Sequence, residues 1–265
     1  MMSALQLHVD GIGLIGPGLP SWARACEVLT GAAALELATP VLPPVNALPP
    51  AERRRVGLAV KLAMAVGLET VAHAGADAST LATVFSSTGG DCDNCHAILE
   101  TLASPDRAVS PTRFHNSVHN APAGYWSIAT GCMTTSTSVC AYDATFAAGL
   151  LEAATQAVAT GAPCMLIAFD TLYPEPLHAL RPIPFAMGVG MLLNPHRTGA
   201  SRACLTLAPS SAEVSTMADA AMESLRRSIP AARSLPLLEC LAKRRTGTLV
   251  IDYLDGCSLA VEVLR

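Results

Sequence analysis

A polar, β-branched run followed by a long apolar segment constrains the fold more than any other part of the chain. Residues 134–139 favour a short strand, because Thr and Val suit a pleated, packed surface. Residues 142–160 then predict a helix that is apolar on every face, and such a helix is normally buried on all sides. We expect the corner between them, residues 140–143, to point into the middle of the molecule. The dipole at such a helix N-terminus can stabilise a thiolate or an oxyanion, so this corner decides most of the functional argument.

The composition favours a well-packed α/β protein that hides part of its surface. Of the 265 residues, 51% are hydrophobic, 14% are charged and only 4% are aromatic, which suits a sheet covered on both faces. So high an apolar fraction also suits a subunit packed against a partner. No apolar run reaches the roughly 18–20 residues of a membrane span, and a net charge of −4 without a basic tract gives no support for nucleic-acid binding. Nine cysteines without an export signal predict reduced thiols in a cytoplasmic protein.

Other segments predict alternating strands and helices. The expected strands are 5–15, which runs into a Gly-rich turn at 10–13, then 81–87, 165–169, 187–193 and 203–207, with a closing hairpin of 248–253 and 258–263. The expected helices are 21–30, 50–74, 93–103, an amphipathic 212–226 and a shorter 235–242. The composition shifts after residue 195.

Three short motifs have the letters of a ligand site. Gly11-x-Gly13 is a weak phosphate-loop signal, because the third glycine is missing and prolines interrupt the helix that should follow. Cys92-Asp-Asn-Cys95-His96 is spaced like a c-type haem attachment site, but nothing indicates export or an axial ligand, and zinc would need two more ligands. We interpret the two cysteines as thiols on a partly buried helix.

The third motif is a pair of histidines. His115 and His119 are spaced like two metal ligands if the segment is helical, but the glutamate of a metalloprotease is missing. We expect polar residues in a packed segment there, and no metal and no cofactor in this protein. Cys140 is the cysteine nearest the helix corner, and we interpret it as a small residue at a strand end rather than a reactive thiol.

Several motifs resemble the N-terminal half of the β-ketoacyl synthases of the thiolase fold. The matching segments are the opening strand and turn at 7–18 with Trp22, Ser87-Thr-Gly-Gly90, Ser110-Pro-Thr112, the block at 117–131, which is the most specific, the segment 146–152 and the Gly-rich strand at 185–193. The similarity covers about residues 5–195 and points to the short ketosynthase-like proteins beside aryl-polyene and xanthomonadin-type pigment synthases. It implies an α/β, thiolase-like domain at 1–195, the N-terminal half only. A short α+β extension at 196–265 would pack on the same core and replace the second half.

The resemblance also implies where the catalytic residues should lie, and they are missing. The family's nucleophilic cysteine falls at Asp143 counted from one side and at Ala144 counted from the other, so it does not coincide with Cys140. The family's two catalytic histidines belong to the C-terminal half, and neither His178 nor His196 has a matching setting. Roughly seventy residues cannot rebuild that half, whose parallel strands need long crossovers.

We therefore predict a subunit that does not catalyse condensation alone. It would pair with a full-length β-ketoacyl synthase, as a chain-length-factor-like subunit of type II fatty-acid or polyketide biosynthesis, and meet acyl carrier protein through that complex. In the family, the strand before the helix corner pairs with its counterpart across a pseudo-twofold axis. The predicted interface residues are Phe114, His115, His119, Asn120, Thr135, Ser136, Thr137 and Ser138. The bulk of Tyr142, Asp143 and Phe146 would set where a growing chain stops.

Two alternatives stay open. The first is an autonomous thioester acyl-transfer or hydrolysing enzyme that uses Cys140 with His115 or His119. The second is a homodimeric scaffold that binds acyl groups or carrier protein without controlling their length.

Overall fold

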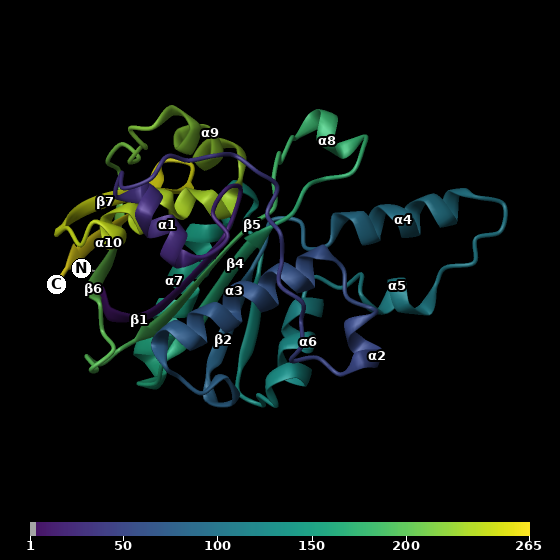
Figure 1. The fold of residues 1–265 in the computed structure, drawn as a ribbon, viewed down its shortest axis with the longest axis horizontal. Coiled ribbons are helices and arrows are strands. Elements are labelled where there is room, and N and C mark those ends of the chain that lie inside the picture. Colours follow the sequence, from purple (N-terminus) through teal and green to yellow (C-terminus); the bar gives the residue numbers. More distant parts are fainter. Residues whose placement is uncertain (1–3) are drawn as a thin grey trace.

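The described residues, 4–265 of the computed structural model, build one eight-stranded sheet between two layers of helices (Figure 1). Along the sheet the strands follow the order β3-β2-β4-β5-β1-β6-β8-β7. Strand β2 is parallel to β3 and β4, and every other neighbouring pair is antiparallel. The strands are β1 (Leu5–Ile15), β2 (Ala82–Ser86), β3 (Ser136–Val139), β4 (Cys164–Asp170), β5 (Met187–Asn194), β6 (Ala203–Ser210), β7 (Gly247–Leu254) and β8 (Cys257–Leu264).

The helices divide between the two faces of the sheet. The α-helices are α1 (Trp22–Leu29), α2 (Pro50–Arg53), α3 (Leu58–Ala74), α4 (Cys92–Ala103), α5 (Pro111–His115), α6 (Ala121–Thr130), α7 (Thr145–Thr160), α8 (Leu177–Leu180), α9 (Ala220–Ser228) and α10 (Leu235–Ala242). Three short 3₁₀ helices are η1 (Ala78–Thr80), η2 (Tyr142–Ala144) and η3 (Pro230–Ser234). Helices α7 and α10 lie on one face, and α3 with α6 covers the other.

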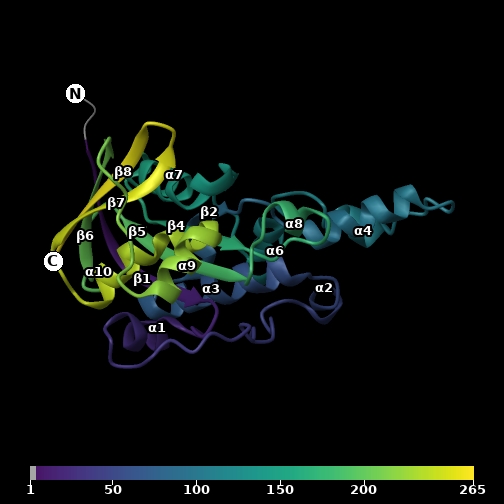
Figure 2. The ribbon, with the colours of Figure 1, turned by 90° about the horizontal axis from the view of Figure 1, so that it is seen from above.

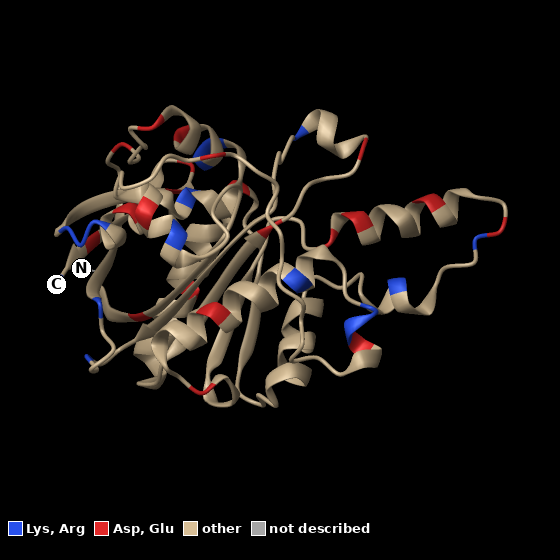
Figure 3. Cartoon of the chain, viewed as in Figure 1, with Lys and Arg blue, Asp and Glu red and all other residues tan. Residues whose placement is uncertain are grey.

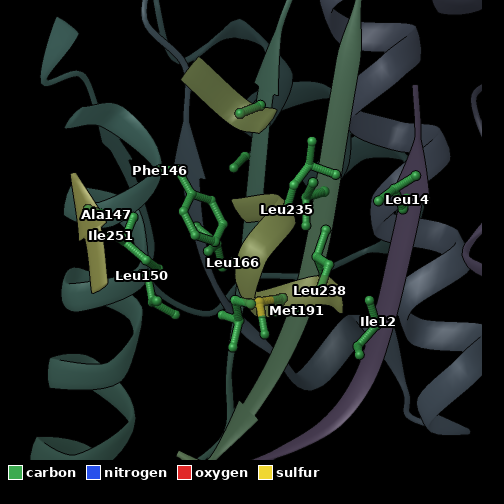
Figure 4. Packing of buried hydrophobic residues seen from close by; sticks show 14 of the residues in the cluster. Ile12, Leu14, Phe146, Ala147, Leu150, Leu166, Met191, Leu235, Leu238 and Ile251 are labelled. Carbon is green, nitrogen blue, oxygen red and sulfur yellow. The ribbon is translucent and has the colours of Figure 1, made fainter. Parts of the chain in front are cut away.

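Strand residues alternate between the two hydrophobic cores. Leu166 of β4 packs with Phe146 and Leu150 of α7 on one face (Figure 4), whereas the next residue, Ile167, packs with Trp126 on the α3 face. All five side chains are shielded almost completely from solvent. A sheet covered on both faces is what the aliphatic composition predicted.

The glycines of β1 serve helix packing. The predicted Gly-rich turn at 10–13 is wrong, because β1 continues as a strand to Ile15, with only a register shift against β5 between Val9 and Gly11. A Cβ atom on Gly13 would lie 2.4 Å from the carbonyl oxygen of Val66 in α3, and one on Gly190 of β5 would lie 2.0 Å from Oγ1 of Thr70. Without side chains at these positions, α3 can lie directly on the two strands.

Two predicted helices have wrong limits. The segment 50–74 forms α2 and α3, separated at residues 54–57, and Gly57 there comes so near Asp91 that a Cβ would lie 2.3 Å from its Oδ2. The segment 212–226 is helical only from Ala220, because Asp219 caps α9 by accepting a hydrogen bond from the Met222 amide at 2.9 Å. The prediction for 235–242 agrees with α10 residue for residue.

Helices α4 and α5 and the loop between them form an arm (residues 92–115) that extends away from the sheet in both views (Figures 1 and 2). The arm exposes large apolar side chains, among them Leu99 and Phe114, with Val118 just beyond it. None of the helices in the described part of the chain is long and apolar enough to cross a membrane.

The candidate site at the start of helix α7

The chain turns from β3 into α7 through η2, and the turn lies at the surface. Tyr142 has φ +52°, a left-handed conformation that non-glycine residues seldom adopt, and its side chain is 63% exposed. Cys140 is exposed as well. The prediction that residues 140–143 point into the middle of the molecule is therefore wrong for these two residues. Strand β3 is an edge strand, so the turn that follows it emerges beside solvent, and burial begins only at Ala144 and Phe146.

Asp143 stands at this turn with its carboxylate already paired. Arg181, from the segment just after α8, forms an ion pair with Asp143, and its guanidinium lies 3.7 Å from the centre of the Tyr142 ring. The same guanidinium donates hydrogen bonds to the Tyr173 hydroxyl at 3.0 Å and to Oγ1 of Thr88 at 3.3 Å. Arg181 therefore fixes both side chains at the turn through charge, hydrogen bonding and a cation–π contact.

A chain of ion pairs connects this turn to the C-terminal part of the sheet. Arg233 of η3 lies 3.4 Å from the second oxygen of Asp143 and 3.3 Å from Asp252 of β7. Asp252 also pairs with Arg226 at 2.9 Å, and Arg226 binds both oxygens of Glu223. The hydrogen bond from Arg226 lowers the pKa of Glu223 to about 2. The network holds the Asp143 carboxylate between two guanidinium groups.

A buried carboxyl group lies beside the turn. Asp170, at the end of β4, is shielded from solvent and accepts hydrogen bonds from the backbone amides of Thr88 and Ala231, each at 2.8 Å. Burial raises the pKa of Asp170 to about 7, although both amide donors act in the opposite direction. Burial likewise raises the pKa of Tyr173 to about 12. Thr88 connects Asp170 to the turn, because its amide donates to Asp170 and its hydroxyl donates to the carbonyl of Tyr142 at 2.7 Å.

The predicted alternative nucleophile has no base bound to it. The thiol of Cys140 donates to the carbonyl oxygen of Thr88 at 3.2 Å, a role that requires its proton. His119 bonds through Nε2 to the carbonyl of Ser87 at 2.8 Å, and His115 packs edge-on against Tyr125. Within residues 4–265, no hydrogen bond joins either histidine to the sulfur of Cys140. Helix α5 also ends at His115, so the two histidines do not share one helical face.

The other predicted site residues differ in how far they are exposed to solvent. Phe114, His115, Asn120, Thr135 and Ser136 are exposed, whereas His119, Thr137 and Ser138 are half-buried. The hydroxyl of Ser136 accepts a hydrogen bond from Thr83 at 2.9 Å, and that of Thr137 accepts one from Gln156 at 2.8 Å. Phe146 is fully buried in the hydrophobic core, next to Leu166 and Ile251 (Figure 4).

The cysteines of the Cys92-x-x-Cys95 motif lie half-buried at the start of α4. The thiol of Cys92 donates to the carbonyl of Gly89 at 3.3 Å, and burial raises its pKa to about 11. No cluster of three or more potential metal ligands occurs in the part of the chain that the structure describes.

Sequence reasoning missed most of the groups that surround Asp143. Arg181, Arg233 and Asp252 come from three segments far apart in sequence, and no local pattern connects them. Asp170 carried a usable signal, because it is a carboxylate at the carboxyl end of a fully apolar strand, which is where sites form in α/β proteins.

Most of the chain matches a known protein family. Residues 22–252 match the sequence profile of the family described as beta-ketoacyl synthase, N-terminal domain, so the chain belongs to that family. No match was found among curated protein sequences.

Three solved structures show the same fold. A chain of the ketosynthase (ApeO) in complex with its chain length factor (ApeC) from Xenorhabdus doucetiae aligns over 97% of this chain and 99% of its own length, with 24% identity and a TM-score of 0.73. A chain of the ishigamide ketosynthase/chain length factor aligns over 98% and 99%, with 13% identity and a TM-score of 0.72. A chain of AntDE:AntF, a type II PKS acyl-carrier protein in complex with its ketosynthase, aligns over the same shares, with 12% identity and a TM-score of 0.75. The predicted α/β, thiolase-like fold is thereby confirmed.

Proposed function

We propose that this chain is a ketosynthase-like subunit without a nucleophile of its own. It would pair with a full-length β-ketoacyl synthase and limit the length of the acyl chain made in type II fatty-acid or polyketide-like biosynthesis. The observation that carries the proposal is the ion pair of Asp143 with Arg181 and Arg233 at the start of α7. A carboxylate held between two guanidinium groups is a poor acyl acceptor, and the neighbouring Cys140 thiol donates a hydrogen bond to the carbonyl of Thr88.

The open edge of the sheet supports pairing with a second subunit. Strand β3 pairs with β2 on one side only. The Thr83 and Ser87 amides bond to the carbonyls of Thr135 and Val139, so the backbone groups of the alternate residues Ser136 and Ser138 face the open edge. An unpaired edge is a template for another strand.

Exposed apolar side chains lie just before and just after β3 and at other positions on the surface. Met133 is 92% exposed just before β3, and Tyr142 follows it. Phe114 of the arm and Ile128 of α6 are also exposed. Such side chains favour a covered surface over a free one. Phe114 and His115 of the arm, with His119 and Asn120 just beyond it, complete the proposed interface.

The descriptions of the three similar solved structures guide the remaining details of the proposed function. Two of them are described as complexes of a ketosynthase with a chain length factor, and the third contains an acyl-carrier protein. By analogy we propose that acyl carrier protein reaches this chain through the heterodimer. The sequence resemblance supports two further proposals. One is a division of the chain at residue 195, and the other is an aryl-polyene or xanthomonadin-type product.

Pairing is tested by co-expression with a full-length β-ketoacyl synthase from the same organism and size-exclusion chromatography. We expect one heterodimer peak for the unaltered chain. Ser138→Pro removes an amide from the open edge without cutting a bond to β2, so it should abolish the heterodimer and leave the chain folded by circular dichroism. Ser138→Thr is the matched control and should pair normally.

Catalytic silence is tested in the same complex. Cys140→Ala and Asp143→Asn should each leave condensation activity largely intact, because the nucleophile belongs to the partner. A chain that stays monomeric beside the ketosynthase contradicts the pairing. Loss of condensation in Cys140→Ala, with the heterodimer intact, would instead favour an acyl-transfer enzyme that uses this thiol.

A further inference from the structure

A concave site lies at the end of the sheet opposite the α7 corner. It is a cleft of about 880 Å³ between β1, α1, the end of α3, the β5–β6 loop and the end of α10. Asp170 pairs with Met187 at one end of β5, whereas the cleft begins beyond Asn194 at its other end. Seven residues of extended strand separate these ends by roughly 20 Å. The cleft is therefore distinct from the site at Asp143.

Arginines dominate the rim of this cleft. Arg197 and Arg202 come from the β5–β6 loop, and Arg244 and Arg245 from the connection between α10 and β7, with the side chain of Arg265 nearby. Figure 3 shows several Lys or Arg positions near the C-terminal end of the chain. In a chain of net charge −4, such a concentration of positive charge in one concave surface needs an explanation.

The positive charges of the cleft have no acidic partner. Among residues 4–265, none of these arginines takes part in an ion pair, and Arg202 only donates to the carbonyl of His73 at 3.1 Å. The acidic residue in the lining is Glu69, and its two oxygens accept the amides of Leu14 at 2.8 Å and Trp22 at 2.7 Å. Glu69 therefore serves the backbone and does not neutralise the rim.

The backbone conformation of Arg244 is a second indication that its side chain is required. The amide of Arg245 bonds to the carbonyl of Cys240, and that of Arg244 to Leu241, which is the Schellman pattern that ends a helix. The position held by Arg244 usually belongs to glycine, and Arg244 has φ +50° there. A non-glycine residue in this conformation costs stability, and such costs are concentrated at functional sites.

The rest of the lining is apolar and suits the body of a small ligand. Trp22, Ile12, Leu241 and Val263 contribute to it, and the volume lies within the range of ligand pockets. We propose that this cleft binds a phosphorylated small molecule of the nucleoside diphosphate class. The guanidinium groups would hold the phosphates by bidentate hydrogen bonds, and the apolar surface would hold the base. The concave shape favours such a ligand over the convex surface of an acidic protein. This proposal does not depend on pairing with a ketosynthase.

The test is isothermal titration calorimetry of the full chain with ADP, ATP, sodium pyrophosphate and adenosine. We expect saturable binding of ADP and ATP at one site, weaker binding of pyrophosphate and none of adenosine. The double variants Arg197→Ala/Arg202→Ala and Arg244→Ala/Arg245→Ala should each weaken ADP binding at least tenfold. Arg54→Ala/Arg107→Ala removes two exposed arginines far from the cleft and is the matched control, with unchanged affinity.

Arg244→Gly separates binding from folding. It relieves the left-handed backbone, so the melting temperature should rise by about 2–4 °C while ADP binding weakens. Four results would overturn the proposal: no saturable binding of ADP, ATP or pyrophosphate at millimolar concentration, equal loss in the control variant, unchanged affinity in both cleft variants, or binding of an acidic peptide in place of the nucleotides.

Discussion

At the scale of single residues, Asp170 is a carboxyl group in an environment that differs greatly from solution. It is buried at the end of β4, and its two oxygens are held by the Thr88 and Ala231 amides. These donors come from the loop after β2 and from η3, so one carboxyl group joins three segments of the chain. Because burial raises its pKa to about 7, its charge changes near neutral pH.

The stability of the protein should therefore depend on pH through Asp170. A carboxyl group whose pKa is raised on folding contributes stability that is fully present below its unfolded pKa of about 3.9. That contribution is lost as the pH rises toward 7. We expect the free energy of unfolding, from urea denaturation, to fall between pH 5 and pH 7.5. Asp170→Asn cannot ionise, so this decline should shrink by at least about 1 kcal/mol. An unchanged pH profile in the variant would assign the decline to other groups.

At the scale of elements, the contact between α3 and the sheet is set by residues without side chains. Gly13 and Gly190 lie on neighbouring strands below Thr70, whose buried hydroxyl donates to the carbonyl of Val66 at 2.7 Å. The glycines leave room for this close approach, and the Thr70 hydroxyl needs no partner in the sheet because it is satisfied within the helix. Thr70 thus packs against the two glycines and has its hydroxyl hydrogen-bonded within α3.

We expect Gly190→Ala to destabilise the protein by about 1–3 kcal/mol, because the added Cβ would lie 2.0 Å from Oγ1 of Thr70. Thr70→Ala removes that oxygen, so the double variant should lose less stability than the sum of the two single variants. Gly124→Ala in α6 is the control, since its Cβ meets nothing within 4 Å, and it should be neutral or slightly stabilising. Additive losses in urea denaturation would show that the contact is not with Thr70.

The helices and strands also show how much of the fold can be predicted from the sequence. Hydrophobic patterns predicted β1, β5, α10 and the closing hairpin, because each segment carries its own period or turn signal. The breaks in 50–74 and 212–226 were missed, since Gly57 and Asp219 act through partners and caps that compete with a helical pattern. The exposed corner at Tyr142 was missed for a similar reason. Composition indicates that α7 is buried, but only the strand order puts β3 at the edge.

At the scale of the whole molecule, the candidate site depends on parts of the chain that sequence alone does not bring together. Counting along the family motif located Asp143, but its partners come from the segment after α8, from η3 and from β7. The ion-pair chain fixes the C-terminal strands to the start of α7. Charged partners that only tertiary structure brings together leave no periodic signal in the sequence, which is why the family resemblance pointed to Asp143 without predicting its surroundings.

Under the proposed function, this arrangement decides which residue could control product length. Phe146 was predicted as part of the gate, but it is fully buried, and its truncation would cost about 3–5 kcal/mol of stability. Tyr142 is exposed beside the open edge of β3, so its size can change without a core cavity. If the partner's acyl tunnel ends at this surface, the Tyr142 ring, held by Arg181, forms its end wall.

We therefore expect Tyr142→Ala to lengthen the products of the reconstituted heterodimer by a small number of two-carbon units, and Tyr142→Trp to shorten them. Each added unit buries two CH₂ groups, worth on the order of 1.6 kcal/mol, until the chain meets a wall that it can pass only by overpacking. Mass spectrometry of carrier-bound products measures the shift. Val158→Ala, on an exposed position near the other end of α7, is the control and should leave the distribution unchanged. Identical distributions in all variants, with the heterodimer intact, would indicate a scaffold that binds its partners without measuring the chain.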